Sequence, residues 1–541
     1  MPIPTPIALV VLTAAVSASP TSPAPPEEAR RWWAHVEALA SDHMRGREAG
    51  TAEHRKAAEY VAAQFRAAGL QPAGTDGFFQ PVAFRVRRYV EAESRLELVR
   101  GKTVEPVALG AEAVFGMRID PAPQVEAPLV FVGYGLTIPE TGHDDLAGVD
   151  LRGKTALYFG GGPKDTPGPL LAHYQSRRER WETLKRAGAI GAVAIRNPRG
   201  EDIPWDRSSL TRFTPAMELT DPELVDTPGQ QLSVAFNTEA AARLFADTGH
   251  DFKELLAAAI EGRPLPHFAV PTAVRAKVVF EADTRASDNV VALLPGSDPA
   301  LAKEYVVVSA HLDHLGVGEP IGGDAIYNGA MDNASGIATL IEAARVLANA
   351  KPRPRRPIVF LAVTAEEKGL LGSRQFAAHP TVPLDAIVAD VNVDMFSPFF
   401  PLKSVIAHGA EESDLGDDLR RVAESMKVEV APDPEPERNG FVRSDQYSFI
   451  RRGIPALTLR VGYLKGSPEQ EVVRRWTKER YHAPSDDLAQ PVDLQAAADF
   501  NRLYVALVVE IANRAERPQW RPASFFRRFA RPASATPNTE R

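Results

Sequence analysis

The sequence predicts an α/β fold built on a mainly parallel mixed sheet flanked by helices. From residue 288 onward, apolar runs such as YVVVSA at 305–310 and PIVFLAV at 357–363 alternate with amphipathic segments such as 334–348. Strands that alternate with helices are typical of β-α-β units, whose helices cover both faces of a parallel sheet. The expected strands are 305–310, 357–363, 386–393 and 456–461, and the expected helices are 334–348, 370–378, 415–426 and 494–512.

Two further helices are expected near the N-terminus. The first covers about 27–40. The second begins after Thr51, a plausible N-cap residue, and ends at Gly69. Both belong to the first part of the α/β domain, which we place at 27–119, ahead of its catalytic part at 273–515.

The region 120–272 has a different texture. Short apolar runs such as 129–132 and 155–159 alternate with turns rich in glycine and proline, and one helix is expected near 177–187. This pattern predicts a separate, strand-rich domain inserted into the first. We expect it to act as a lid or partner surface, because no tight cluster of ligand-type residues lies in it.

Composition excludes several classes of function. The 541 residues include 62 Lys and Arg, 70 Asp and Glu, and no cysteine, for a net charge of -8. The absence of cysteine excludes disulfides, thiolate metal ligands and a cysteine nucleophile. The negative charge argues against nucleic acid as a partner, because phosphate binding requires a clustered basic surface. The oligomeric state is not readable from the sequence.

The two ends of the chain carry their own expectations. An apolar run at 7–16, followed by small residues and four prolines, predicts a signal peptide and leader over 1–26, although its start lacks Lys and Arg. We therefore expect a secreted or periplasmic protein. No stretch is long enough for a stable membrane span. The segment 516–541, rich in Pro, Arg, Ser and Thr, predicts a mobile tail.

Metal-binding side chains gather where predicted strands end. In an open parallel sheet, ligands bind beyond the carboxyl ends of the strands. Histidine nitrogen and carboxylate oxygen suit zinc, with cobalt or manganese as substitutes. Two histidines and three carboxylates suffice for two ions if one carboxylate bridges them. The candidates are His311, Asp313, His314, Asp332, Glu366, Glu367, Asp394, Tyr481 and His482.

Six segments in this order resemble the di-zinc exopeptidases of the bacterial leucyl aminopeptidase type. They are SAHLDHLG (309–316), NGAMDNASG (328–336), TAEEKGLLGS (364–373), NVDM (392–395), RSDQYSF (443–449) and YHAPSDD (481–487). Relatives of that family are the glutamate carboxypeptidases, glutaminyl cyclases and the transferrin receptor. The stretches 45–65 and 130–154 also resemble family members, the second resembling the inserted protease-associated domain. The resemblance implies the zinc exopeptidase fold.

The resemblance also implies a role for each residue. His311 and His482 bind zinc, Asp332 bridges two ions, and Glu367 and Asp394 each complete one ligand set. Glu366 is the general base. Asp313 orients His311, Tyr481 steadies the oxyanion, and the Asp332–Asn333 peptide bond is cis. For His314 we favour a structural role over metal binding.

One departure affects the substrate site. Many family members have histidine where this chain has Gln446. That position is no metal ligand in the family pattern, so the departure places substrate contacts near Ser444 and Asp445 in question and leaves metal binding intact.

The expected function is that of a metallo-aminopeptidase, a hydrolase that releases N-terminal residues from a peptide substrate. Three alternatives stay open. A carboxypeptidase of the same family would need a basic pocket, which Arg443 or Arg460 could supply. A glutaminyl cyclase would work with one zinc. A non-catalytic, receptor-like binding module would have lost ligands.

Overall fold

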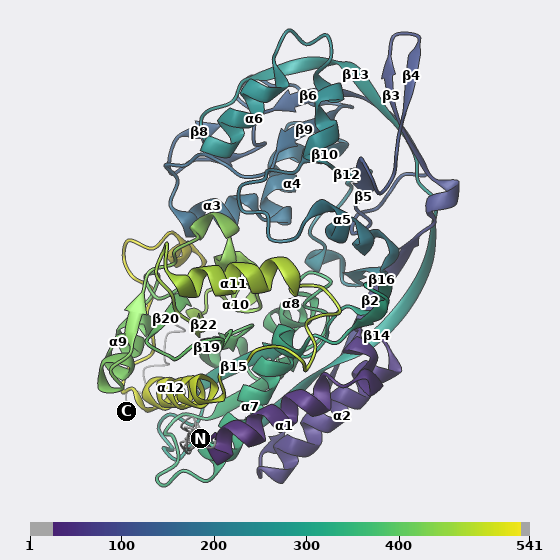
Figure 1. Ribbon diagram of the computed structural model, residues 1–541. Helices are drawn as coiled ribbons and strands as arrows, with labels where there is room; N and C mark the ends of the chain where they lie inside the picture. The colour runs from purple at the N-terminus through teal and green to yellow at the C-terminus, as the bar shows by residue number, and fades with distance from the viewer. Residues whose placement is uncertain (1–24, 532–541) are drawn as a thin grey trace, which may run out of the picture.

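The computed structural model describes residues 25–531, which form two sheets with helices packed around them (Figure 1). The expected signal peptide and most of the leader over 1–26 lie outside these residues. Within 25–531, no helix is both long and apolar enough to cross a membrane.

The larger sheet has ten strands and is parallel at its centre. Its order is β11-β2-β14-β18-β15-β19-β22-β20-β21, with β1 beside β14. β15 runs parallel to β18 and β19, and β19 runs parallel to β22, whereas β14 and β20 pair antiparallel with their central neighbours. The bounds are β1 Gln71–Pro72, β2 Phe79–Tyr89, β11 Ala216–Leu219, β14 Phe280–Leu294, β15 Tyr305–His311, β18 Ile358–Val363, β19 Ile387–Val393, β20 Ser404–His408, β21 Glu429–Ala431 and β22 Ala456–Val461.

Helices cover both faces of this sheet, as its continuous apolar runs require. Along β15, Val306 and Val308 pack in one core cluster and Val307 in another, because successive side chains of a strand point to opposite faces. The first cluster takes in α1 (Glu27–Leu39), α2 (Ala52–Ala67), α7 (Ser335–Ala348), α9 (Leu415–Ser425) and α12 (Leu494–Asn513), and the second takes in α8 (Leu371–Ala378) and α10 (Gln446–Ile450).

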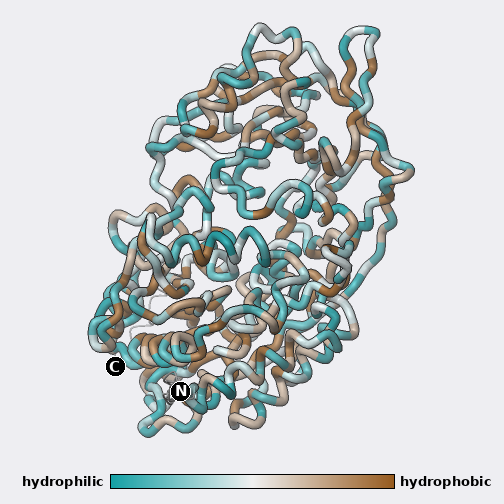
Figure 2. The backbone as a smooth tube through the Cα atoms, in the orientation of Figure 1, coloured by the Kyte–Doolittle hydropathy of each residue, from teal (hydrophilic) through white to brown (hydrophobic). Residues whose placement is uncertain are grey.

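The smaller sheet has eight strands in the order β4-β3-β13-β6-β9-β10-β12-β5. The chain enters it after β2 and returns through β14, so the smaller sheet lies beyond one end of the larger (Figure 1). In Figure 2, hydrophobic residues, drawn in brown, recur along the inner segments of each part. The bounds are β3 Arg95–Arg100, β4 Thr103–Val107, β5 Ala113–Phe115, β6 Gln124–Val132, β9 Thr155–Phe159, β10 Gly191–Ile195, β12 Leu232–Phe236 and β13 His267–Lys277, with α3 (Gly168–Gln175), α4 (Arg177–Arg186) and α6 (Phe252–Glu261) packed nearby.

Most expected elements from 305 to 512 are found within one residue of their predicted ends. Two expectations were wrong. The smaller sheet begins at β3, residue 95, and not near 120, and β11 from within the expected insertion joins the larger sheet instead.

The expected mobile tail over 516–541 was also wrong in its first part. Phe526 is fully buried, and its ring centroid lies 4.7 Å from that of Phe441. Trp520 donates a hydrogen bond to the carbonyl oxygen of Gly453 at 3.0 Å. Aromatic side chains placed among the arginines therefore hold 520–529 against the second core cluster.

Replacing Phe526 by alanine should lower the free energy of unfolding by about 3 to 5 kcal/mol, because a buried ring is lost and a cavity remains. Urea unfolding followed by tryptophan fluorescence would measure the change. Arg527→Ala, an exposed neighbour, is the control. Equal stability of the Phe526 variant and the parent would show that the segment contributes nothing, as a mobile tail would.

Candidate metal centre

Three parallel strands deliver side chains to one edge of the larger sheet. β15 ends at His311, the loop after β18 carries Glu366 and Glu367, and Asp394 directly follows β19. Asp332 comes from the turn before α7, and His482 from the loop after α11 (Pro468–Glu479). Because neighbouring parallel strands end at the same edge, segments far apart in sequence meet here.

Five of the expected ligands form two overlapping groups. His311 Nε2 lies 3.1 Å from Asp332 Oδ1 and 3.3 Å from Asp394 Oδ1. His482 Nε2 lies 3.2 Å from Asp332 Oδ2 and 3.1 Å from Glu367 Oε2. Asp332 thus turns one carboxylate oxygen toward each histidine, which is the arrangement that a bridging ligand needs. The Asp332–Asn333 peptide bond is cis, as the resemblance implied.

His314 also lies in this centre. It is fully buried, and its Nδ1 lies 2.7 Å from Glu367 Oε1 and 3.9 Å from Asp332 Oδ2. Glu367 therefore stands between two imidazoles, with one oxygen toward His482 and the other toward His314. Neither ring nitrogen of His314, nor Glu367 Oε1, makes a hydrogen bond of good geometry. The structural role expected of His314 stays a prediction.

The charges of these groups call for a cation. Burial alone would lower the pKa of His482, but the carboxylates of Glu367 and Asp332 raise it to about 10. The pKa of His311 is likewise raised well above its usual value, against burial, by Asp394 and Glu366. The same carboxylates would favour a metal cation at this position. Buried nitrogen and oxygen donors in this number fit zinc.

Asp313 does not orient His311 through its carboxylate. The two groups are 4.0 Å apart, too far for a hydrogen bond, and His311 Nδ1 lies 3.1 Å from the backbone oxygen of Asp313 instead. The carboxylate accepts from the backbone N–H groups of Glu366 at 2.9 Å and Glu367 at 3.3 Å. Asp313 thus fixes the loop that carries both glutamates.

Asp486 fixes the backbone at Asp332 as Asp313 fixes the backbone at Glu366. The sequence analysis did not single out this residue. It is fully buried and accepts from the N–H of Met331 at 2.9 Å and of Asp332 at 3.0 Å. Its place in the YHAPSDD segment was the available signal.

Arg47 is a second residue that we did not single out. Its fully buried guanidinium donates to the backbone oxygens of Leu39, Leu312, Asn328 and Gly329 at 2.5–2.9 Å. It thus joins the end of α1 to the two loops that carry His311 and Asp332.

Glu366 and Tyr481, the expected base and oxyanion donor, line a cavity together with Asp332, Asp394 and His482. Burial raises the pKa of Glu366, and its acidic neighbours Glu367, Asp445 and Asp394 raise it further. Both side chains line the two cavities that meet at the centre. The Tyr481 hydroxyl accepts a hydrogen bond from Arg443 Nη2 at 3.2 Å, so its own hydrogen is available to a substrate oxygen.

The departure at Gln446 is structural. This buried side chain donates to the backbone oxygen of Phe441 at 2.9 Å and accepts from Asn392 at 3.2 Å. Its neighbour Asp445 is fully buried with both carboxylate oxygens unpaired in the described structure, and burial raises its pKa to about 7.

Comparison with known proteins shows what residues 289–508 are similar to. Residues 289–508 match the profile described as "Peptidase family M28". Aminopeptidase YwaD of Bacillus subtilis is 28% identical over 222 residues, which cover 40% of this chain and 43% of that protein. A probable zinc metalloprotease of Pyrenophora teres f. teres is 37% identical over 107 residues, covering 20% and 22%. The chain thus spans less than half the length of these relatives.

One solved structure shows the same fold over most of the chain. The aminopeptidase from Aneurinibacillus sp. strain AM-1 is 20% identical, covers 89% of this chain and 93% of its own, and superposes with a TM-score of 0.53. At this sequence identity, the likeness shows the fold alone.

Replacing Asp486 by asparagine should weaken zinc binding by about 10- to 100-fold, because the backbone that carries Asp332 loses its carboxylate acceptor. Competition with a chromophoric chelator would measure the affinity. Asp487→Asn is the matched control, since the carboxylate of that more exposed neighbour accepts from Ala489 N within its own turn and pairs with Arg480. Unchanged affinity in the Asp486 variant would remove it from the support of the site.

Proposed function

We propose that this chain, whose residues 289–508 form a peptidase family M28 domain, is a zinc-dependent aminopeptidase that removes N-terminal residues from peptides. The observation that carries the proposal is that Asp332 places one carboxylate oxygen near His311 and the other near His482. Glu366 lies beside them and belongs to neither ligand group. A complete set of donors argues against a receptor-like module that has lost its ligands. A bridging carboxylate argues against the one-zinc chemistry of a cyclase.

The residues present fit two zinc ions. His311, Asp332 and Asp394 would hold one, and His482, Asp332 and Glu367 the other. When bound, the ions would supply a water of lowered pKa and polarise the scissile carbonyl.

Glu366 supplies the proton transfer. Its loop is fixed by Asp313, so its carboxylate has a defined place beside the ligands. It takes the proton of the attacking water and later delivers it to the leaving amine, for which its raised pKa suits it. The Tyr481 hydroxyl, held by Arg443, donates to the oxyanion that forms at the carbonyl.

We further propose that the smaller sheet is a protease-associated domain and that the chain is secreted or periplasmic. The sequence resemblance at 130–154 supports the first, and the apolar run at 7–16 supports the second.

Glu366→Gln should lower kcat by about two to four orders of magnitude, because general base catalysis is lost. Hydrolysis of leucine p-nitroanilide would measure the rate, with zinc content measured on the same sample. Zinc should stay bound, since Glu366 belongs to neither ligand group. Glu223→Gln, which changes another glutamate lining the cleft, is the control. Normal turnover in the Glu366 variant would remove it as the base.

The metal content should be two zinc ions per chain. Elemental analysis of the purified protein would count them, and a strong chelator should abolish hydrolysis until zinc is returned. Asp332→Ala should lose both ions, because it removes the shared ligand, whereas Asp394→Ala should lose one. One ion per chain in the parent protein would overturn the two-ion site.

A further inference from the structure

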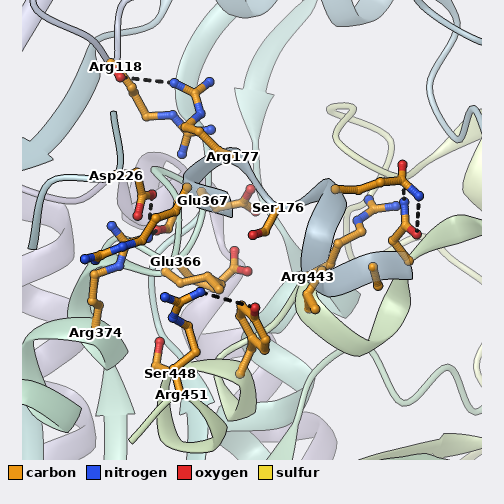
Figure 3. A pocket seen from close by; sticks show the side chains of 18 of the residues that line it. Arg118, Ser176, Arg177, Asp226, Glu366, Glu367, Arg374, Arg443, Ser448 and Arg451 are labelled. Carbon is orange, nitrogen blue, oxygen red and sulfur yellow. Dashed lines mark hydrogen bonds and ion pairs between the residues drawn. The ribbon is translucent and has the colours of Figure 1, made fainter. Parts of the chain in front are cut away.

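The cleft that leads to Glu366 carries an excess of guanidinium groups. Its volume is about 790 Å³, and loops and helices from both parts of the chain line it. Figure 3 shows Arg118, Arg177 and Arg374 gathered on one side, with Glu366 and Glu367 nearby. The other arginines that line it are Arg178, Arg443, Arg451 and Arg452.

Arg118 and Arg177 are cations without acidic partners. Arg118 Nη1 donates to the backbone oxygen of Lys368 at 2.5 Å, and Arg177 Nη1 donates to the backbone oxygen of Arg118 at 3.1 Å. Among the ion pairs within 4 Å in residues 25–531, neither arginine takes part, whereas Arg374 pairs with Asp226 at 2.8 Å. Most donors of both guanidinium groups therefore remain free.

The carboxylates near Arg118 and Arg177 do not neutralise the positive charge of both guanidinium groups. Repulsion from Arg177 and burial together lower the pKa of Arg118 to about 9, although Asp226 and Glu366 act against this. Asp226 and Glu218 also act on Arg177, but Asp226 is already paired with Arg374, and Glu218 with Arg85 and Arg87. An anion placed between Arg118 and Arg177 would relieve this repulsion.

Two cavities meet at Glu366, the cleft and a smaller pocket. The smaller pocket, of about 90 Å³, continues past Glu366 toward Met395 and Thr458. This smaller pocket suits the single N-terminal residue of a substrate, whereas the larger cleft has room for the peptide that follows it. The two cavities share Glu366, Arg443, Tyr481 and His482. With the N-terminal residue in the small pocket, the rest of the peptide extends into the cleft.

We propose that Arg118 and Arg177 bind a carboxylate of the peptide on the leaving-group side. Guanidinium groups match carboxylates in shape and charge through paired N–H donors. The carboxylate is either the C-terminus of a short peptide or an acidic side chain that follows the cleaved bond. The inference rests on the proposed aminopeptidase function and assigns its preferred substrate class. Arg118 follows β5 of the smaller sheet and Arg177 begins α4, so this part of the chain would take part in substrate selection.

Two matched substrate pairs test the proposal and separate the two sources of the carboxylate. Leu-Gly against Leu-Gly-amide reports on the C-terminus, and Leu-Asp-amide against Leu-Asn-amide reports on the side chain. We expect kcat/KM to favour the charged member of at least one pair by about tenfold or more, as charge-assisted hydrogen bonds allow. In Arg118→Gln and Arg177→Gln that ratio should fall toward one.

Arg275→Gln is the matched control, because this arginine of β13 pairs with Glu126 at 2.7 Å and does not line the cleft. Its ratio should equal that of the parent enzyme. Hydrolysis of all four substrates with a ratio near one in both pairs would overturn the proposal and leave the aminopeptidase function standing.

Failure to cleave any of the four would count against the proposed function instead. Calorimetric titration of Glu366→Gln with Leu-Gly and Leu-Gly-amide, and with the Asp and Asn pair, then tests the arginines without turnover. A lower Kd for a charged ligand, lost when Arg118→Gln is added, supports them as the carboxylate site. Equal Kd values in both pairs overturn it.

Discussion

The structure depends on holding many buried carboxylates together at one edge of a sheet. Asp313, Asp332 and Asp486 are buried within this region, and Glu366, Glu367 and Asp394 are largely covered. Like charges at such distances repel strongly where water is excluded. Each carboxylate must therefore face a specific partner. Asp313 and Asp486 accept hydrogen bonds from backbone N–H groups. Asp332, Glu367 and Asp394 instead lie beside imidazoles, where a metal ion would also fit.

Arg47 provides the fixed positive charge beneath this group. Burial lowers its pKa to about 10, and Asp486, Asp313 and Asp332 act in the opposite direction, so it remains protonated near neutral pH. Its donors are used on backbone oxygens rather than on the carboxylates, which leaves the carboxylates free for metal binding. A single buried cation thus both stabilises the negative site and fixes the loops that form it. Removing one such partner would leave the others uncompensated.

The sequence was sufficient to predict those ligands that directly follow a predicted parallel strand. Apolar runs located β15, β18 and β19, and the rule that parallel strands end at one edge brought His311, Glu367 and Asp394 together. His482 comes from a loop, so only the resemblance indicated it. The support given by Arg47 and Asp486 was missed because hydrogen bonds to backbone atoms depend on loop conformation and leave no spacing pattern. α11 was missed because its sequence is mostly polar, with few buried apolar residues.

The loop that carries Glu366 and Glu367 also contacts the smaller-sheet part of the molecule. Lys368, next to the glutamate pair, accepts from Arg118 through its backbone oxygen and pairs with Glu48 through Nζ at 2.8 Å. Glu48 in turn follows Arg47, which holds the metal-binding loops. Both contacts are made by Lys368, and they fix Arg118 of the smaller-sheet part relative to Glu366. A sheet that only covered the site would not need the contact between Arg118 and Lys368. If it selects substrates, as proposed, it must hold Arg118 at a fixed distance from Glu366.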